Sequence, residues 1–290
     1  MRLDAMERDP GTPNAARMYD FFLGGKDNFA ADRAAAEQVV ALYPEIRYAV
    51  QANRQFHQRA ARWMARAGIR QFLDLGCGLP TMESTHEAVR REAADARVVY
   101  ADNDPVVIAH ARALLADEVR TVAVAQDARE PEALLRDPLT RRLLDPSEPA
   151  GVLITAVLHF VSDESDPAGI IARYMAALAP GSAIAVSHGT ADNLSAEATD
   201  EGERIYAASA DPIYLRSLEQ VRALFTGLEL VPPWNGAEPG ITEPAKWAGP
   251  DMPPPEGADG SVPVLTARGP AVLWCGAAVD RKGAGSPGRS

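Results

Sequence analysis

The sequence predicts an α/β fold built on a mostly parallel, doubly wound sheet. From residue 69 onward, short apolar segments alternate with helical patterns, and a segment such as GVLITAVL (151–158) shows almost no polar alternation. Strands of this kind are buried on both faces, as in a parallel sheet covered by helices. The composition agrees, because 47% hydrophobic and 24% charged residues over 290 positions are globular proportions.

A helical region is expected before the first strand. Residues 1–13 are polar and contain Pro and Gly, which predicts a loose tail. Capping and stop residues then mark helices that we expect over about 14–24, 30–42 and 45–67. Gly68 stops the last of them, so residues 14–68 are interpreted as one helical cap or lid.

The sheet itself is expected within residues 69–281. The parallel strands should lie at 70–75, 97–102, 119–126, 151–157 and 182–188. The helices between them should lie at 81–94, 105–116, 130–144 and 167–179. Two more helical patterns follow at 195–209 and 213–226. A strand at 228–233, a Pro/Gly-rich loop at 234–269 and a last strand at 271–280 come after them. Two strands joined by a long loop at the end of a parallel sheet predict a terminal antiparallel pair, followed by a disordered tail at 282–290.

Charge and cysteine usage exclude several classes of protein. The net charge of -11 argues against a general nucleic-acid binder, which usually presents a basic face. Cys77 and Cys275 lie far apart, so neither a disulfide framework nor a zinc site is expected. No apolar run approaches the ~18 residues of a membrane span, and the N-terminus lacks the apolar core of a signal peptide. We therefore expect a cytoplasmic protein with no metal and no membrane association.

The segment FLDLGCGLP (72–80) carries the first chemical signal. Gly76 and Gly78 allow a tight turn between a strand and a helix, leaving room for a ligand. A dinucleotide site would have a third glycine, but Pro80 and Thr81 stand there instead. Asp74 at the strand end would repel a pyrophosphate and suits a cationic ligand such as a sulfonium amino acid. A purely structural turn also fits this segment.

Acidic residues also end the next two strands. Asp102 closes RVVYAD and is placed to accept both hydroxyls of a ribose. Asp104 precedes Pro105 and is interpreted as a helix N-cap. Asp127 follows TVAVAQ, where it either contacts an adenine amine or caps the helix near Pro131. Since the ends of successive parallel strands converge on one crevice, the three acids together predict a single site.

This pattern resembles the class I S-adenosylmethionine-dependent methyltransferases, whose sheet is Rossmann-like with a terminal antiparallel strand. With ARMYDFFLGGKDNFAADRAAAEQV (16–39) and VLHFVSDESDP (157–167), the chain most resembles the S-adenosyl methyltransferases of GC-rich Gram-positive bacteria, long catalogued as a domain of unknown function. The resemblance implies S-adenosylmethionine as cofactor and a bacterial source. It also implies that the methionine part is held by Asp74, Gly76 and Gly78, the ribose by Asp102, and the adenine by Asn103, Asp127 and Ala128.

The polar turn at 24–29 has two interpretations. It is either a helix–helix turn or part of a lid that closes over the ligands. Lys26 and Asn28 are candidate cofactor contacts in this turn, and either Arg17 or Lys26 is expected to pair with the methionine carboxylate.

The resemblance places His159, after the fourth strand, opposite the transferred methyl group. It is the first candidate for a general base, with Tyr19 as the second, although a packed histidine fits equally well. His188 is a weaker candidate, and His57, His86 and His110 are interpreted as surface or packing residues. The acids Asp163, Glu164 and Asp166 either ligate a metal or, as we prefer, form a loop that caps the helix near Pro167.

The expected reaction is methyl transfer to a small-molecule acceptor. The acceptor should bind among the N-terminal helices, residues 189–216 and the 234–269 loop. Aromatic and Met side chains in these parts either stack on a flat substrate or anchor the loop: Tyr206, Tyr214, Trp234, Trp247 and Met252. A cofactor-binding regulator without transferase activity and a nicotinamide-dependent oxidoreductase are the alternatives, and a homodimer is one option for assembly.

Overall fold

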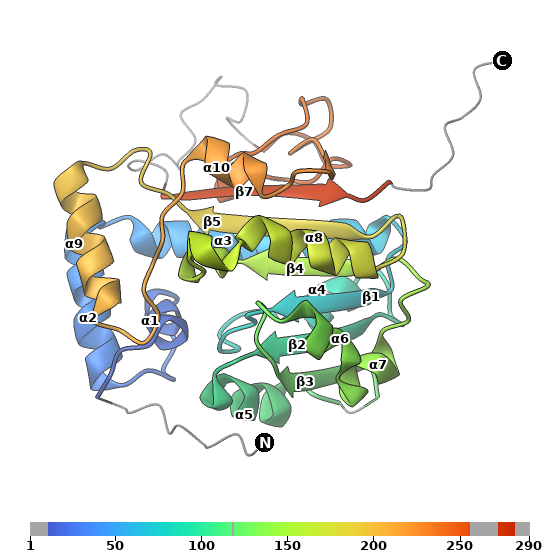
Figure 1. Cartoon of the computed structure of the whole chain (residues 1–290), viewed down its shortest axis with the longest axis horizontal. Helices are drawn as coiled ribbons and strands as arrows, with labels where there is room; N and C mark the ends of the chain where they lie inside the picture. The colour runs from blue at the N-terminus through green and yellow to red at the C-terminus, as the bar shows by residue number, and fades with distance from the viewer. Residues whose placement is uncertain (1–10, 118, 256–271, 282–290) are drawn as a thin grey trace.

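A seven-stranded sheet forms the centre of the protein in a computed structural model that describes residues 11–117, 119–255 and 272–281. The strand order is β3-β2-β1-β4-β5-β7-β6 (Figure 1). The strands are β1 Gln71–Leu75, β2 Arg97–Asp102, β3 Thr121–Ala125, β4 Gly151–Thr155, β5 Ala183–Gly189, β6 Glu229–Leu230 and β7 Leu273–Val279. Reversal of the order between β1 and β4 creates a switch point, where ligands bind in open α/β sheets.

The pairing of the strands confirms the predicted topology. Strands β1 to β5 are parallel to one another, while β7 runs antiparallel to both β5 and β6. The predicted last strand therefore lies between β5 and β6. In the register, Leu75 pairs with Ala101 and Asp102 pairs with Ala125, so the carboxyl ends of β1, β2 and β3 lie level.

Ten α-helices occur in the described residues. They are α1 Ala15–Phe22, α2 Ala30–Leu42, α3 Ile46–Arg66, α4 Thr85–Arg90, α5 Pro105–Leu114, α6 Pro131–Arg136, α7 Pro138–Leu143, α8 Pro167–Ala177, α9 Ala196–Ala207 and α10 Leu218–Ala223. The helix predicted over 130–144 is two helices, because Asp137 and Pro138 end one and begin the next. The helices predicted over 81–94 and 213–226 are each only six residues long.

Helices cover both faces of the sheet, and each face has its own apolar core. Side chains of α3, α4 and α5 pack on one face, and side chains of α6, α7, α8 and the two residues that follow α10 pack on the other. A third cluster joins α1, α2 and α3 to α9, around Met18, Phe22, Val39 and Ile205 (Figure 1). Helices α1 and α2 thus pack with each other and with α9 beside the carboxyl ends of the strands, whereas α3 also packs on the sheet.

The loop after β6 is fixed to the body by Trp247. Its ring is fully buried and meets Phe56 and Trp63 of α3 edge-on, with centroids 5.2 and 6.0 Å away. Arg59 adds two hydrogen bonds, from Nε to the Trp247 carbonyl at 2.6 Å and from Nη2 to the Pro244 carbonyl at 2.7 Å. Only residues 234–255 of the predicted 234–269 loop lie within the described residues, as do residues 11–13 of the predicted N-terminal tail, and the 282–290 tail lies outside them.

Candidate functional site

The segment after β1 forms the floor of the candidate site. Gly76 and Gly78 adopt φ values of 67° and 63°, a region that side chains rarely occupy. A Cβ at Gly76 would lie 2.4 Å from a methyl group of Val157, whereas nothing lies within 4 Å at Gly78. The amides of Gly76 and Cys77 donate to the carbonyl of Ala101 at 2.8 and 3.2 Å, so the loop folds back over the end of β2.

Asp102 fixes the other side of this loop. Its Oδ2 accepts from the amide of Gly78 at 3.1 Å, and its Oδ1 accepts from the amide of Asp104 at 2.9 Å. Asp104 in turn caps α5 by accepting from the amide of Val106, as predicted. The Asp102 carboxylate is therefore oriented by the backbone while it lines the cavity, and a carboxylate oxygen can accept more than one hydrogen bond.

Asp127 lies beyond the end of β3 and is paired with Arg129. Arg129 donates from Nη2 to Oδ2 at 2.6 Å and from Nε to both oxygens at 3.0 Å, and Asn103 Nδ2 approaches Oδ2 at 3.4 Å. Burial acts to raise the pKa of Asp127, but the hydrogen bonds and charge of Arg129 outweigh it and hold the pKa below its usual value. Glu130 occupies the N-cap of α6, so Asp127 does not cap that helix.

Asp74 is the end of a buried hydrogen-bond chain. Thr85 Oγ1 donates to Asp74 Oδ2 at 2.6 Å, and His57 Nε2 lies 2.7 Å from the same hydroxyl. Because the single hydroxyl proton goes to the carboxylate, Nε2 must carry the histidine proton, and Nδ1 accepts from Thr155 Oγ1 at 2.8 Å. Burial lowers the pKa of His57 to about 4. The histidine that we interpreted as a surface or packing residue is thus a neutral, buried link between α3, α4 and β4.

One cavity of about 450 Å³ runs along the carboxyl ends of the strands. Nine of the predicted site residues line it: Tyr19, Asp74, Gly76, Gly78, Asp102, Asn103, Asp127, Ala128 and His159. Lys26 and Asn28 are not among the lining residues. The structure therefore brings together the residues that end β1, β2 and β3, which the sequence spreads over more than fifty positions.

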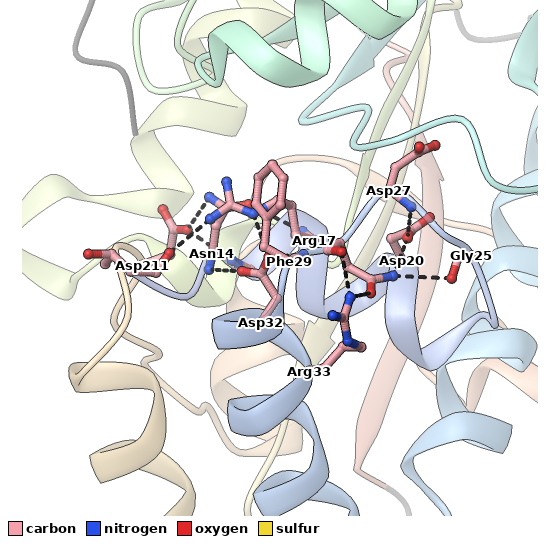
Figure 2. Close-up of polar contacts among 12 residues, drawn as sticks. Asn14, Arg17, Asp20, Gly25, Asp27, Phe29, Asp32, Arg33 and Asp211 are labelled. Atoms are coloured by element: carbon pink, nitrogen blue, oxygen red, sulfur yellow. Dashed lines mark hydrogen bonds and ion pairs between the residues drawn. The ribbon is translucent and has the colours of Figure 1, made fainter. Parts of the chain in front are cut away.

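The turn between α1 and α2 is organised by Asp20 (Figure 2). Asp20 Oδ2 accepts from the amide of Asp27 at 2.9 Å and from Asn28 Nδ2 at 2.7 Å, and Oδ1 accepts from Thr81 Oγ1 at 2.7 Å. A side chain at Gly25 would overlap the Asp20 carboxylate. Asn28 is therefore occupied in building the turn, while Lys26 is exposed on its outside. The bond to Thr81 ties the turn to the glycine loop.

Arg17 and Arg54 differ in their partners and in their position relative to the cavity. Arg17 is buried against Asp32, with Nε 2.7 Å from Oδ2, and does not line the cavity (Figure 2). Arg54 of α3 does line it, and within the described residues no carboxylate pairs with its guanidinium, whose only hydrogen bond is a long one of 3.4 Å to the carbonyl of Glu83. Neither Arg17 nor Lys26 is thus placed at the cavity, and Arg54 escaped prediction because its helix carries four other arginines.

His159 is held in a tautomer that does not suit a general base. Its Nδ1 accepts from the amide of Gly189 at 3.0 Å, so the proton of the neutral ring sits on Nε2. Burial, followed by the charges of His188 and Arg216, holds the pKa of His159 well below its usual value. The ring is therefore packed, as one of the two interpretations of His159 held, and it also faces the cavity. It does so as a hydrogen-bond donor and not as the general base of the other interpretation.

Tyr19 is also poorly placed to accept a proton. Its hydroxyl donates to the carbonyl of Val50 at 3.2 Å and accepts from Asn53 Nδ2 at 2.9 Å. Burial raises the pKa of Tyr19, and the opposing contribution of the Asn53 hydrogen bond is smaller. The phenol therefore stays protonated, and its ring serves as cavity wall.

Arg216 organises the segment after β4. It donates to the carbonyls of Leu158 and Val161 at 3.0 and 2.8 Å, to Asp163 Oδ1 at 2.6 Å, and to His188 Nε2 at 2.8 Å. Burial lowers the pKa of His188 to about 4, so His188 is a neutral packing partner.

The three acids after β4 do not gather around a common point. Asp163 pairs with Arg216, Asp166 caps α8 by accepting from the amide of Gly169, and Glu164 is exposed. No group of three or more His, Cys, Asp or Glu side chains suited to a metal occurs within the described ranges.

Some of the predicted aromatic residues line the cavity, and another fixes the loop after β6 to the body of the protein. Tyr206 and Tyr214 line the cavity, while Trp247 anchors the loop. Trp234 and Met252 belong to that loop and are not among the lining residues. The far wall therefore comes from the N-terminal helices, α9 and residues 210–215.

A doubly wound sheet with strand-end carboxylates around one cavity defines a nucleoside-cofactor-binding α/β protein. The model of the family described as S-adenosyl methyltransferase matches residues 3–270. A DUF574 family protein from Streptomyces avermitilis is 34% identical, with a TM-score of 0.81 over 94% of this chain and 99% of its own. A candidate methyltransferase from Thermobifida fusca is also 34% identical, with a TM-score of 0.81 over 97% of this chain and 100% of its own. No protein with a curated description matches.

The chain belongs to the S-adenosyl methyltransferase family. The resemblance stated from the sequence, the fold and the S-adenosyl cofactor are thereby confirmed. None of the described helices is both long enough and apolar enough to cross a bilayer.

Proposed function

We propose that the protein transfers a methyl group from S-adenosylmethionine to a small-molecule acceptor. The observation that supports this most is the continuity of the cavity, which joins the three strand-end carboxylates to an apolar chamber beside β4, β5 and α9. When bound, S-adenosylmethionine supplies a methyl group on a positively charged sulfur. The protein must then align the acceptor with that group and keep water away.

The charges around the cavity fit the parts of this cofactor. Asp74 Oδ1 has no donor among the described residues and suits the ammonium group, and the Arg54 guanidinium suits the carboxylate. Asp102 is oriented to accept ribose hydroxyls, and Asp127, Ala128 and Asn103 border the position expected for adenine. The bare glycine backbone at Gly76 and Gly78 leaves room for the chain between sulfur and carboxylate.

Binding and turnover test this proposal separately. We expect calorimetric titration to show binding of S-adenosylmethionine and S-adenosylhomocysteine and none of NAD. Binding of NAD alone would instead support a nicotinamide-dependent oxidoreductase. A regulator that binds the cofactor without transferring the methyl group is the second candidate, since neither His159 nor Tyr19 is placed to take a proton. Formation of S-adenosylhomocysteine in the presence of an acceptor would exclude that candidate.

A further inference from the structure

The chamber beside β4 and β5 is apolar. Its wall contains six large side chains from four α-helices, one 3-10 helix and one loop: Phe22, Val39, Ile46, Phe160, Tyr206 and Leu215. The residues that β4, β5, α2, α9 and the segment after β4 contribute to the lining include no charged side chain. The charged lining residues lie at the ends of β1 to β3, on α1 where Asp20 bonds the glycine loop, on α3 as Arg54, and at Asp211, which bonds Asn14 before α1. A carboxylate or ammonium group away from the reacting atom of the acceptor would thus lie in this chamber without a counter-ion, whereas a negative charge on the reacting atom itself would face the sulfonium.

His159 places one hydrogen-bond donor in this wall. The side chain is 5% exposed, and Nδ1 is engaged by the amide of Gly189. The proton on Nε2 has no partner among the described residues, and this atom is not sealed from the cavity that His159 lines. A ligand that fills the chamber has to offer this donor an acceptor atom, because leaving a buried polar group unpaired costs about 1–3 kcal/mol.

The donor is held rigidly. Arg216 binds the carbonyls of Leu158 and Val161, which flank His159 in the chain. The His159 carbonyl accepts from the amide of Tyr214 at 2.6 Å, and the His188 ring packs edge-on at 5.5 Å between centroids. The ring therefore cannot turn to offer Nδ1 without losing the Gly189 hydrogen bond.

We propose that the methyl acceptor is a flat, apolar molecule with an acidic hydroxyl, a phenol or an enol, and that His159 Nε2 donates to its oxygen. This inference rests on the proposed function. An oxyanion has three lone pairs, so it can accept this hydrogen bond and still attack. An amine nitrogen has one lone pair and cannot do both. The hydrogen bond also stabilises the oxyanion, which compensates for the absence of a base beside it.

The reaction balances without a proton transfer to the protein. The hydroxyl releases its proton to solvent before or on binding, and the acceptor enters as an oxyanion. Its oxygen forms a bond to the methyl carbon as the carbon–sulfur bond breaks, and the electron pair of that bond stays on sulfur. The negative charge of the oxygen and the positive charge of the sulfonium cancel, leaving a neutral ether and a neutral thioether.

Two substitutions of His159 separate the effect of its hydrogen-bond donor at Nε2 from the effect of the shape of its ring. His159→Asn keeps an oxygen near Nδ1 for the Gly189 amide and removes the donor at Nε2. His159→Gln places an amide donor near Nε2. With a naphthol as acceptor, we expect kcat/KM to fall about 10- to 100-fold in His159→Asn and to recover to within about tenfold in His159→Gln. His110→Gln, on α5 and outside the cavity, is the control and should leave kcat/KM unchanged.

Acceptor choice and proton position give independent readouts. We expect β-naphthol to bind the complex with S-adenosylhomocysteine and to be methylated with S-adenosylmethionine, in preference to β-naphthylamine and β-naphthoic acid. Across naphthols of differing acidity, the inflection of kcat/KM with pH should follow the acceptor hydroxyl. Nitrogen NMR at pH 7 should show His159 neutral, with its proton on Nε2.

The outcomes distinguish this inference from the proposed function. Absence of cofactor binding in the unmodified protein would remove the proposed function and this inference with it. Intact cofactor binding with methylation of the amine or the acid, or with no ring compound bound, would overturn the acceptor class alone. Full activity of His159→Asn, or a proton on Nδ1, would overturn the role of His159.

Discussion

Asp102 has two tasks at the scale of a single residue, because it holds the glycine loop and faces the ligand. We expect Asp102→Asn to weaken binding of S-adenosylhomocysteine about 10- to 100-fold, the value of one or two charge-assisted hydrogen bonds. The variant also loses one acceptor for the amides of Gly78 and Asp104, so a lower melting temperature should accompany the weaker binding. Calorimetric titration measures the affinity, with exposed Asp95→Asn as the control. An unchanged dissociation constant would remove Asp102 from the ribose site.

Arg54 provides a test of how the methionine part is recognised. We expect Arg54→Gln to weaken S-adenosylhomocysteine at least about tenfold, since the ligand carboxylate loses its counter-ion. Methylthioadenosine lacks the carboxylate, so its affinity should change little in the same variant. Arg70→Gln, outside the cavity, is the matched control. Equal losses for both ligands would mean that Arg54 supports the fold of the site and does not bind the carboxylate.

Residues of the candidate site could be predicted from the sequence where they stand directly after a predicted strand. Asp74, Asp102 and Asp127 were found because each ends an apolar run. The position of the proton on His159 Nε2 could not be predicted, because it is determined by a hydrogen bond from the amide of Gly189, thirty residues later. His57 was missed for a similar reason, since its hydroxyl partners come from α4 and β4.

At the scale of elements, the bond between Asp20 and Thr81 couples the α1–α2 turn to the glycine loop. We expect Thr81→Val to loosen the turn, because the hydroxyl that reaches Asp20 is lost while the volume is kept. Lys26 reports this directly, since it is one of three lysines in the chain and is exposed in the turn. Cleavage at Lys26 by a lysine-specific protease should be faster in Thr81→Val and slower when S-adenosylhomocysteine is bound.

The same experiment tests the interpretation of this region as a lid. Cleavage at Lys246 gives an internal reference, because that lysine lies in the loop anchored by Trp247 and away from the cavity. Equal protection of both lysines by the ligand would indicate a general stabilisation and not closure of a lid. No protection of Lys26 would support the alternative interpretation, a plain helix–helix turn.

Element boundaries were predicted well where local signals end an element and poorly where distant contacts do. The first two helices match closely because Asn14 caps one and Gly24 follows it with a φ of 80°. The helix predicted at 213–226 begins late because the amides of Tyr214 and Arg216 bind the carbonyls of His159 and Gly189. Those bonds draw the segment across the end of the cavity, and no local pattern announces them.

At the scale of the whole molecule, the site lies where three apolar clusters meet. Two of them sandwich the sheet, and the third joins the N-terminal helices to α9. Figure 1 shows α1, α2 and α9 beside the carboxyl ends of the strands. The fold class was predictable because alternating strands and helices repeat along the chain. The closure of the cavity by α9 was not, because it needs contacts between residues about 160 positions apart.

The buried neutral histidines set how the stability of the molecule depends on pH. Burial lowers the pKa of His57 and of His188 to about 4, below the ordinary value of 6.5 in the unfolded chain. Between these values the unfolded chain binds more protons, so the free energy of unfolding falls as the pH falls. The slope is about 1.4 kcal/mol per pH unit for each histidine. We expect urea unfolding to show full stability above pH 6.5 and a loss of about 2 kcal/mol per histidine at pH 5.

Proton uptake checks the origin of this loss. Unfolding near pH 5.5 should take up protons, seen as a calorimetric enthalpy that varies with the ionisation enthalpy of the buffer. His57→Gln keeps hydrogen-bonding groups near Thr85 and Thr155 and removes the titrating ring, so it should make the dependence on pH shallower. If that variant does not fold, NMR titration of the unmodified protein still measures the pKa of His57. A pKa near 6.5 would mean that groups other than His57 cause the loss of stability in acid. A pKa near 4 would assign part of this loss to the hydrogen-bonded series of His57, Thr85 and Asp74.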